Sequence, residues 1–223
     1  MSKLNLFLSN LLISIVTISS FLQPISVAEG QIPQQTLSWW NIFRRKPPRE
    51  ETPKTSRPQN PICLISPNAS SQVIWNTKPL FLWKGDINKI AVENLGSKKY
   101  LGTKIVTGNQ SVNYTGQPLE PGKIYKWLIF LSELESASPS RFVNFKIMEA
   151  PERNRITAEL KLLEILQKHK GGNAETIAFT KAEYFAEKGL WSDALQEAYS
   201  VPNPSPELSQ MIKDLPLQLC ESK

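Results

Sequence analysis

Eight short segments between residues 62 and 149 constrain the fold of this chain more than any other feature. Each is rich in β-branched or aromatic residues and is bounded by turn residues. They are residues 62–66, 73–75, 80–84, 89–93, 104–107, 111–114, 125–131 and 142–148. Short strands at this regular spacing predict an all-β sandwich of two packed sheets over residues 61–150.

Segment 80–84 shows the alternation that a strand needs. Leu80 and Leu82 fall on one face, whereas Phe81 and Trp83 fall on the other, because successive side chains of a strand point to opposite faces. One of these two pairs must therefore face the core.

A tight turn followed by a buried strand occurs at residues 118–131. The spacing L-x-P-G-x-x-Y-x-W is formed by Leu119, Pro121, Gly122, Tyr125 and Trp127, in which Pro-Gly makes the turn. It resembles the start of the penultimate strand in fibronectin type III and immunoglobulin-like sandwiches, where a tyrosine hydrogen-bonds back to the backbone. Tyr125 and Trp127 are accordingly interpreted as structural core residues.

After residue 150 the apolar period becomes helical. Residues 152–170 place Ile156, Leu160, Leu163 and Leu166 on one stripe, which predicts an amphipathic helix. Further helices are expected from a cap at residue 173 to about residue 188 and from 191 to about 200, ended by prolines. The prediction is a small helical region over residues 151–215, followed by a tail at 216–223.

The second and third of these helices resemble one tetratricopeptide-type hairpin. The pattern places a glycine at the turn and small or aromatic residues where two helices touch. Its members are Ala182, Phe185, Gly189, Trp191, Ala194, Ala198 and Pro206. A concave peptide groove needs about three such repeats, so this single hairpin is given a structural role.

The order of these parts resembles an exported cyanobacterial family known as domain of unknown function 928. The resemblance rests on four segments: residues 62–64, the P-x-F-x-W pattern of residues 79–83, the turn at 119–127, and the G-[IL]-W-x-D-A-L element at 189–195. It implies an exported sandwich with a helical hairpin, and it brings no established activity or site.

The first 28 residues are predicted to be a signal peptide. Lys3 is followed by an apolar run over residues 6–22, and Ser26 with Ala28 matches the small-residue pattern read by signal peptidase. Cleavage after Ala28 would release a mature protein into the periplasm or cell envelope, and the alternative is an uncleaved anchor helix. In such a compartment Cys63 and Cys220 either form a disulfide or remain two separate thiols.

Residues 29–60 are rich in proline and predict a stiff, disordered tether. The aromatic segment 39–43 interrupts it and precedes a basic run that includes Arg44 and Arg45. Trp39, Trp40 and Phe43 with these arginines are candidates for contact with a partner or, over residues 39–46, with an anionic membrane surface. The alternative is that the aromatic residues fold back onto the domain as a short helical turn.

The sequence contains no pattern typical of a catalytic or metal site. His169 is the only histidine and is expected at a helix end, and Glu133 with Glu135 is expected in a solvated loop. Neither cofactor nor metal is predicted, because phosphate-loop, nucleophile and zinc spacings are lacking. The net charge of +6 is scattered among acidic residues and predicts no nucleic-acid surface.

The function expected from these features is that of a non-enzymatic interaction or assembly module with an unidentified protein partner. A sandwich edge and a helix face can bind by backbone pairing and apolar burial, which needs no catalytic group. The alternative is a module that binds carbohydrate or another envelope polymer, with Trp75 or Tyr100 as a stacking platform.

Overall fold

The computed structural model describes residues 38–44, 62–68 and 72–221. The predicted signal peptide, its cleavage site after Ala28, and most of the predicted tether, including Arg45, lie outside these residues. The alternatives of a cleaved signal and a retained anchor therefore remain expectations.

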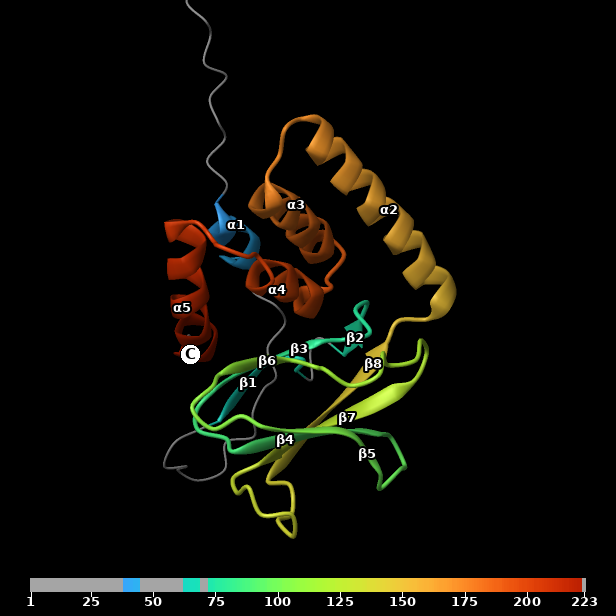
Figure 1. Ribbon diagram of the computed structural model, residues 1–223, viewed down its shortest axis with the longest axis vertical. Helices are drawn as coiled ribbons and strands as arrows, with labels where there is room; N and C mark the ends of the chain where they lie inside the picture. The colour runs from blue at the N-terminus through green and yellow to red at the C-terminus, as the bar shows by residue number, and fades with distance from the viewer. Residues whose placement is uncertain (1–37, 45–61, 69–71, 222–223) are drawn as a thin grey trace, which may run out of the picture. The chain divides into compact units, whose positions relative to one another are not determined.

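Two sheets form the β part of the protein (Figure 1). The three-stranded sheet has the order β1 (Cys63–Ser66), β3 (Leu80–Lys84), β6 (Ser111–Asn113). The five-stranded sheet has the order β2 (Val73–Ile74), β8 (Arg141–Ile147), β7 (Ile124–Phe130), β4 (Lys89–Asn94), β5 (Tyr100–Ile105). All pairs are antiparallel except β2 with β8. Each of the eight predicted segments overlaps one of these strands.

The largest difference from the predicted strands is at β5. The prediction placed this strand at residues 104–107, whereas β5 begins at Tyr100 and pairs with β4 along its length, with an irregularity opposite Val92 and Glu93. Gly102 and the preceding Lys98 and Lys99 weaken the apolar alternation, so the sequence pattern shows only the end of the strand.

Five helices are present in the described residues: α1 (Trp39–Arg44), α2 (Ala150–His169), α3 (Ala174–Glu187), α4 (Trp191–Tyr199) and α5 (Pro206–Glu221). The prediction of a tail at 216–223 was wrong, because α5 extends to residue 221. Pro206 begins this helix, where its missing N–H costs nothing, and the Ser205 hydroxyl accepts a hydrogen bond from the Leu208 N–H at 3.2 Å. Pro216 lies inside the helix, although proline ordinarily predicts a helix end.

The three-stranded sheet is covered on both faces. Phe81 and Trp83 of β3 belong to the core between the two sheets. Leu80 and Leu82, on the opposite face of the same strand, belong to a second core shared with the helices. Both side-chain pairs of β3 are therefore buried. The sequence led us to expect that only one of the two pairs would face a core. In Figure 1 the helices cover this sheet on the side away from β4 and β7.

The N-terminal half of α4 is hydrogen-bonded to the loop after β2. The two carboxylate oxygens of Asp193 accept the backbone N–H groups of Trp75 and Asn76, each at 2.9 Å. Arg153 at the start of α2 donates from Nε to the Trp75 carbonyl at 3.0 Å, and the Trp75 indole N–H donates to the Arg153 carbonyl at 3.2 Å. These bonds fix the first turns of α2 and α4 against the β part.

Cys63 and Cys220 form a disulfide, with their Cα atoms 6.0 Å apart. Cys63 lies at the start of β1 and Cys220 lies near the end of α5. The sequence left this bridge and two separate thiols equally open, and the described residues contain no free cysteine. The bridge ties the last helix to the first strand of the three-stranded sheet.

Helix α1 agrees with the alternative given for the aromatic segment, a short helical turn folded back onto the domain, and corrects the choice of Trp39 and Phe43 as contact residues. Trp39 is fully buried and Phe43 is 4% exposed, both in the core shared with the helices. The Trp39 indole N–H donates to Glu175 Oε1 at 3.1 Å, and its ring meets Phe179 edge-on with centroids 5.1 Å apart. Trp39 and Phe43 are thus unavailable for a membrane or partner while the protein is folded, and residues 39–44 are not part of a disordered tether. Trp40 is half-buried and Arg44 is exposed.

Candidate interaction surface

The residues predicted to be structural lie in the interior of the protein or at its turns. Tyr125 and Trp127 are buried between the sheets, and the Tyr125 hydroxyl accepts the backbone N–H of Glu120 at 2.8 Å. That bond back across the turn is the one expected from the tyrosine motif. In the α3–α4 hairpin, Gly189 has a φ of 73° at the turn and Ala194 is fully buried. Trp191, at the start of α4, is half-buried.

The outer face of the five-stranded sheet is partly covered by the loop at residues 131–140. Ala91, Leu128 and Phe130 form a small buried cluster on this face, with Ala137 packed against it. The Lys89 ammonium lies 4.5 Å from the Phe130 ring centroid and donates to the Leu134 carbonyl at 2.7 Å. This bond holds the loop over the end of the sheet formed by β4 and β7.

The rest of the outer face exposes large apolar side chains. Register places Phe142 beside Leu128, and the two-residue period places Ile124 on the same face. Ile105 is opposite Lys89, and Tyr100 is opposite Glu93. The exposed fractions are 58% for Phe142, 42% for Ile124, 58% for Ile105 and 44% for Tyr100. We call these four residues the outer apolar face. They share this face with the Lys126–Glu93 ion pair, whose charged atoms lie 3.4 Å apart, and apolar side chains exposed on one face offer contacts to a partner.

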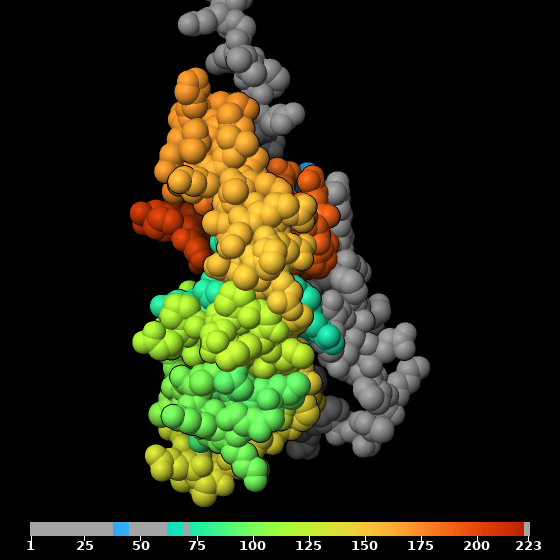
Figure 2. All heavy atoms as spheres, turned by 90° about the vertical axis from the view of Figure 1, so that its right-hand side faces the viewer, coloured from blue at the N-terminus to red at the C-terminus, as the bar shows by residue number. Residues whose placement is uncertain are grey.

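Strand β5 is the free edge of this sheet. No other described strand pairs with its outer side. The Val106 N–H donates to the Asn88 carbonyl at 2.8 Å, and hydrogen-bonded pairs alternate along an antiparallel ladder. The backbone groups of Gly102 and Lys104 therefore point toward β4, whereas those of Thr103 and Ile105 point away from it. This edge lies within the lower half of the face seen in Figure 2, where the β4–β5 hairpin is green.

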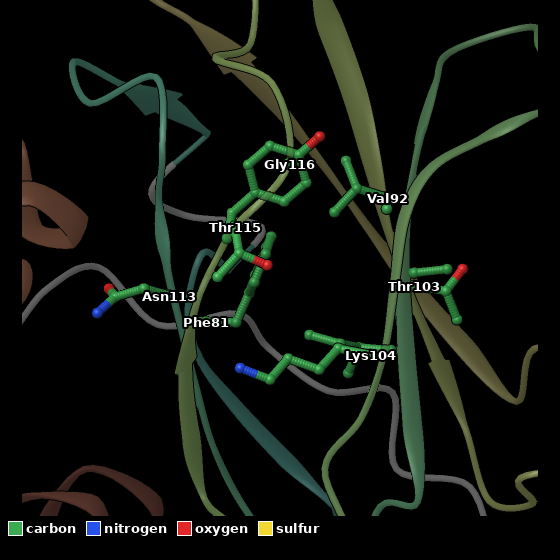
Figure 3. Close-up of a pocket in the computed structure, with 11 residues that line it drawn as sticks. Phe81, Val92, Thr103, Lys104, Asn113, Thr115 and Gly116 are labelled. Atoms are coloured by element: carbon green, nitrogen blue, oxygen red, sulfur yellow. The ribbon is translucent and has the colours of Figure 1, made fainter.

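A pocket of about 120 Å³ opens between β5 and β6, at the edge where the two sheets separate (Figure 3). Its apolar lining includes Phe81, Ile90 and Val92 from the core between the sheets. Thr103, Lys104, Asn113 and Thr115 also line it, but the side chains of Thr103 and Asn113 point away from the pocket in Figure 3. In Figure 3 the Lys104 side chain reaches across the pocket toward the β6 side.

Tyr114 closes the inner part of this pocket. Its hydroxyl donates to the Leu101 carbonyl at 3.4 Å, and burial raises the pKa of the phenol above its usual value. A Cβ atom on Gly116 would lie 2.2 Å from the Tyr114 hydroxyl oxygen, and one on Gly102 would lie 3.1 Å from the Tyr114 ring. Glycine at these two positions gives the ring its space.

The titratable residues considered from sequence are not brought together. His169 is exposed at the end of α2, and Glu133 and Glu135 are exposed in the loop after β7. Glu133 accepts a hydrogen bond from the Thr107 hydroxyl at 2.6 Å. None of these three residues lines the pocket. Within residues 38–44, 62–68 and 72–221, no three histidine, cysteine or carboxylate side chains are grouped as metal ligands, and no helix has the length and apolar character to span a membrane.

Trp75 and Tyr100, the proposed stacking platforms, have different surroundings. The Trp75 ring packs against Phe185, with centroids 5.4 Å apart, and the Arg153 guanidinium lies 5.2 Å from its centroid. Tyr100 contacts the Phe130 ring edge-on at 6.3 Å and keeps 44% of its surface exposed. Only Tyr100 thus offers an open ring.

Sequence reasoning placed neither the edge of β5 nor the pocket among the candidate sites. The signal present in the sequence was the lysine-rich stretch around Tyr100, which is typical of an edge strand. No protein-family model, no curated protein and no solved structure matches this chain.

Proposed function

We propose that this protein is a non-enzymatic interaction module that binds a protein partner through the edge of β5 and the outer apolar face. The observation that carries this proposal is the free edge of β5 lying beside exposed Tyr100 and Ile105. An added strand would pair with the backbone of Thr103 and Ile105, and apolar burial against the outer face would add affinity.

The architecture supports this use of the sheet. The strand orders β1-β3-β6 and β8-β7-β4-β5 agree with those of immunoglobulin-like and fibronectin type III sandwiches, and the Tyr125 hydrogen bond agrees with their tyrosine corner. We assign the β part to this class as a proposal. Strand β5 is already paired with β4, so a partner strand that binds its free edge does not have to order β5 first.

Location outside the cytoplasm belongs to the same proposal. A disulfide such as Cys63–Cys220 persists in an oxidising compartment, which supports export by the predicted signal peptide. The resemblance to the exported cyanobacterial family is consistent with a periplasmic or envelope-associated adaptor.

The test is site-specific photo-crosslinking in cells. A photoreactive amino acid replaces Ile105 in one variant and Leu162 of α2 in the control, because the two side chains are 58% and 57% exposed. We expect one defined partner to crosslink at position 105 and not at 162, and the purified partner to bind the purified protein. Equal capture at both positions, or capture without binding by the purified partner, would refute the proposal.

The second candidate function is binding of an envelope polysaccharide. The exposed Tyr100 ring favours it, because sugar rings stack on open aromatic faces. Retention of the protein on purified cell-wall material, lost in Tyr100→Ala and kept in Tyr100→Phe, would support this second function over the first.

A further inference from the structure

We propose that the pocket between β5 and β6 binds an extended partner peptide in which an apolar residue and an acidic residue lie two positions apart. This inference rests on the proposed function, and it adds the chemistry of the partner strand. It follows from the register of β5, the size of the pocket and the position of one lysine.

Register determines which side chains of an added strand would enter the pocket. Thr103 and Ile105 direct their backbone groups to the free edge, so a partner strand in the plane of the sheet would pair with them. Gly102 and Lys104 are opposite Val92 and Ile90, whose side chains lie in the core between the sheets. The partner residues beside Gly102 and Lys104 therefore point into the same gap, and the residue between them points outward.

The position beside Gly102 suits an apolar side chain. Gly102 has no side chain, and the adjacent lining is made by Phe81, Val92 and the Tyr114 ring. An apolar cavity of about 150 Å³ holds a benzene molecule. A pocket of about 120 Å³ therefore has room for one branched aliphatic side chain.

The position beside Lys104 suits a carboxylate. The Lys104 side chain enters the pocket region from the edge strand and has no hydrogen-bond or ion-pair partner among the described residues. No aspartate or glutamate lines the pocket. Lys98 and Lys99 precede the same strand, so the charged residues within 98–105 are all lysines. A directly opposed pair of opposite charges on neighbouring strands is stabilising, whereas like charges repel.

An inward lysine on an edge strand also has a simpler role, because it discourages edge-to-edge aggregation. The two roles differ in what they require. A protective charge works with either sign, so Lys104→Glu should leave an aggregation-blocking edge intact. Recognition of an acidic residue requires the positive sign at this position.

The experiment measures binding of synthetic peptides of about ten residues to the protein with its disulfide intact. One peptide is rich in threonine and valine, with leucine and glutamate two positions apart, and a matched peptide has lysine in place of the glutamate. Fluorescence anisotropy gives the affinity, and amide chemical shifts locate the site. We expect the acidic peptide to shift residues 100–105 and 113–116 and to bind at least about tenfold more tightly than the lysine peptide, the effect of one charge-assisted hydrogen bond.

Matched variants separate charge from position. Lys104→Glu is expected to weaken the acidic peptide about tenfold and to strengthen the lysine peptide, whereas Lys99→Glu changes the net charge equally and should alter neither by more than about twofold. Thr103→Pro removes the N–H at the free edge and should abolish binding, whereas Thr103→Val keeps that N–H and should bind. If Thr103→Pro does not fold, the comparison of Lys104→Glu with Lys99→Glu still tests the inference.

The inference is overturned if neither peptide binds at millimolar concentration, if the shifts lie elsewhere, or if the variants at 104 and 99 behave alike. A partner that crosslinks at position 105 while binding equally to wild type and Lys104→Glu would retain the proposed function and refute only the acidic strand. Failure of crosslinking at 105 would refute the proposed function itself.

Discussion

Replacement of Asp193 by asparagine tests how the helices are attached to the β part. Asp193 is 1% exposed, and its two oxygens accept the N–H groups of Trp75 and Asn76. Asparagine keeps one acceptor oxygen and turns an NH₂ group toward the other N–H. One donor then loses its partner, which costs about 1–3 kcal/mol.

The cost depends on pH because burial raises the pKa of Asp193 from 3.8 to about 7. The Trp75 and Asn76 hydrogen bonds oppose this rise, nearby Glu197 adds to it, and Arg153 opposes it. Between these two pKa values the folded state keeps a proton that the unfolded state has released. Stability of the wild type therefore falls as pH increases from about 4 to 7 and is level above that, with a total loss of up to about 4 kcal/mol.

Asp193→Asn lacks this titration, so the difference between the two free energies of unfolding should shift in favour of the variant as pH rises. Urea unfolding at pH 5, 6, 7 and 8 gives the free energy of unfolding of each. We expect the free energy of unfolding of the wild type to fall by about 2–3 kcal/mol relative to the variant between pH 5 and pH 8. The rest of the total loss occurs below pH 5 and is not measured in this range. Asp86→Asn, at an exposed position, is the control and should follow the wild type. A wild-type advantage that stays constant over this range would refute the reasoning.

Three further variants test separate parts of the fold by urea unfolding. The double variant Cys63→Ser, Cys220→Ser should lower the free energy of unfolding by about 5 kcal/mol, because the disulfide closes a loop of 157 residues in the unfolded chain. An unchanged urea midpoint would show that the disulfide does not stabilise the protein in this way. Tyr125→Phe should cost about 1 kcal/mol by leaving the Glu120 N–H without its acceptor, and no loss would show that water replaces the bond. Trp39→Ala should cost about 3–5 kcal/mol because the side chain is fully buried, whereas a tryptophan in a free tether would cost nothing.

Elements with a strong local pattern were predictable from sequence. The Pro-Gly turn before Tyr125 and the small residues of the α3–α4 hairpin each specify a local geometry, and the structure has both. Helix α5 was missed because proline at 206 and 216 ordinarily marks an end. Pro206 instead begins the helix, next to the capping Ser205.

The candidate site was less accessible to sequence reasoning. Tyr100 was noticed only as an aromatic residue, because lysines and Gly102 interrupt the strand pattern around it. The pocket between β5 and β6 joins residues from separate strands, and no local pattern relates Lys104 to Asn113. Register and sheet order place these residues together.

Local sequence patterns were sufficient for seven of the eight strands, the end of β5, the turn at Pro121 and the change to helical periodicity, because each depends on neighbours a few residues apart. Tertiary structure decided that both faces of β3 are buried, that α1 packs into the helical core, and that Cys63 meets Cys220. It also decided that β5 remains an edge. These outcomes depend on which surfaces pack together in the folded protein. That packing is stabilised by contacts between residues far apart in the sequence.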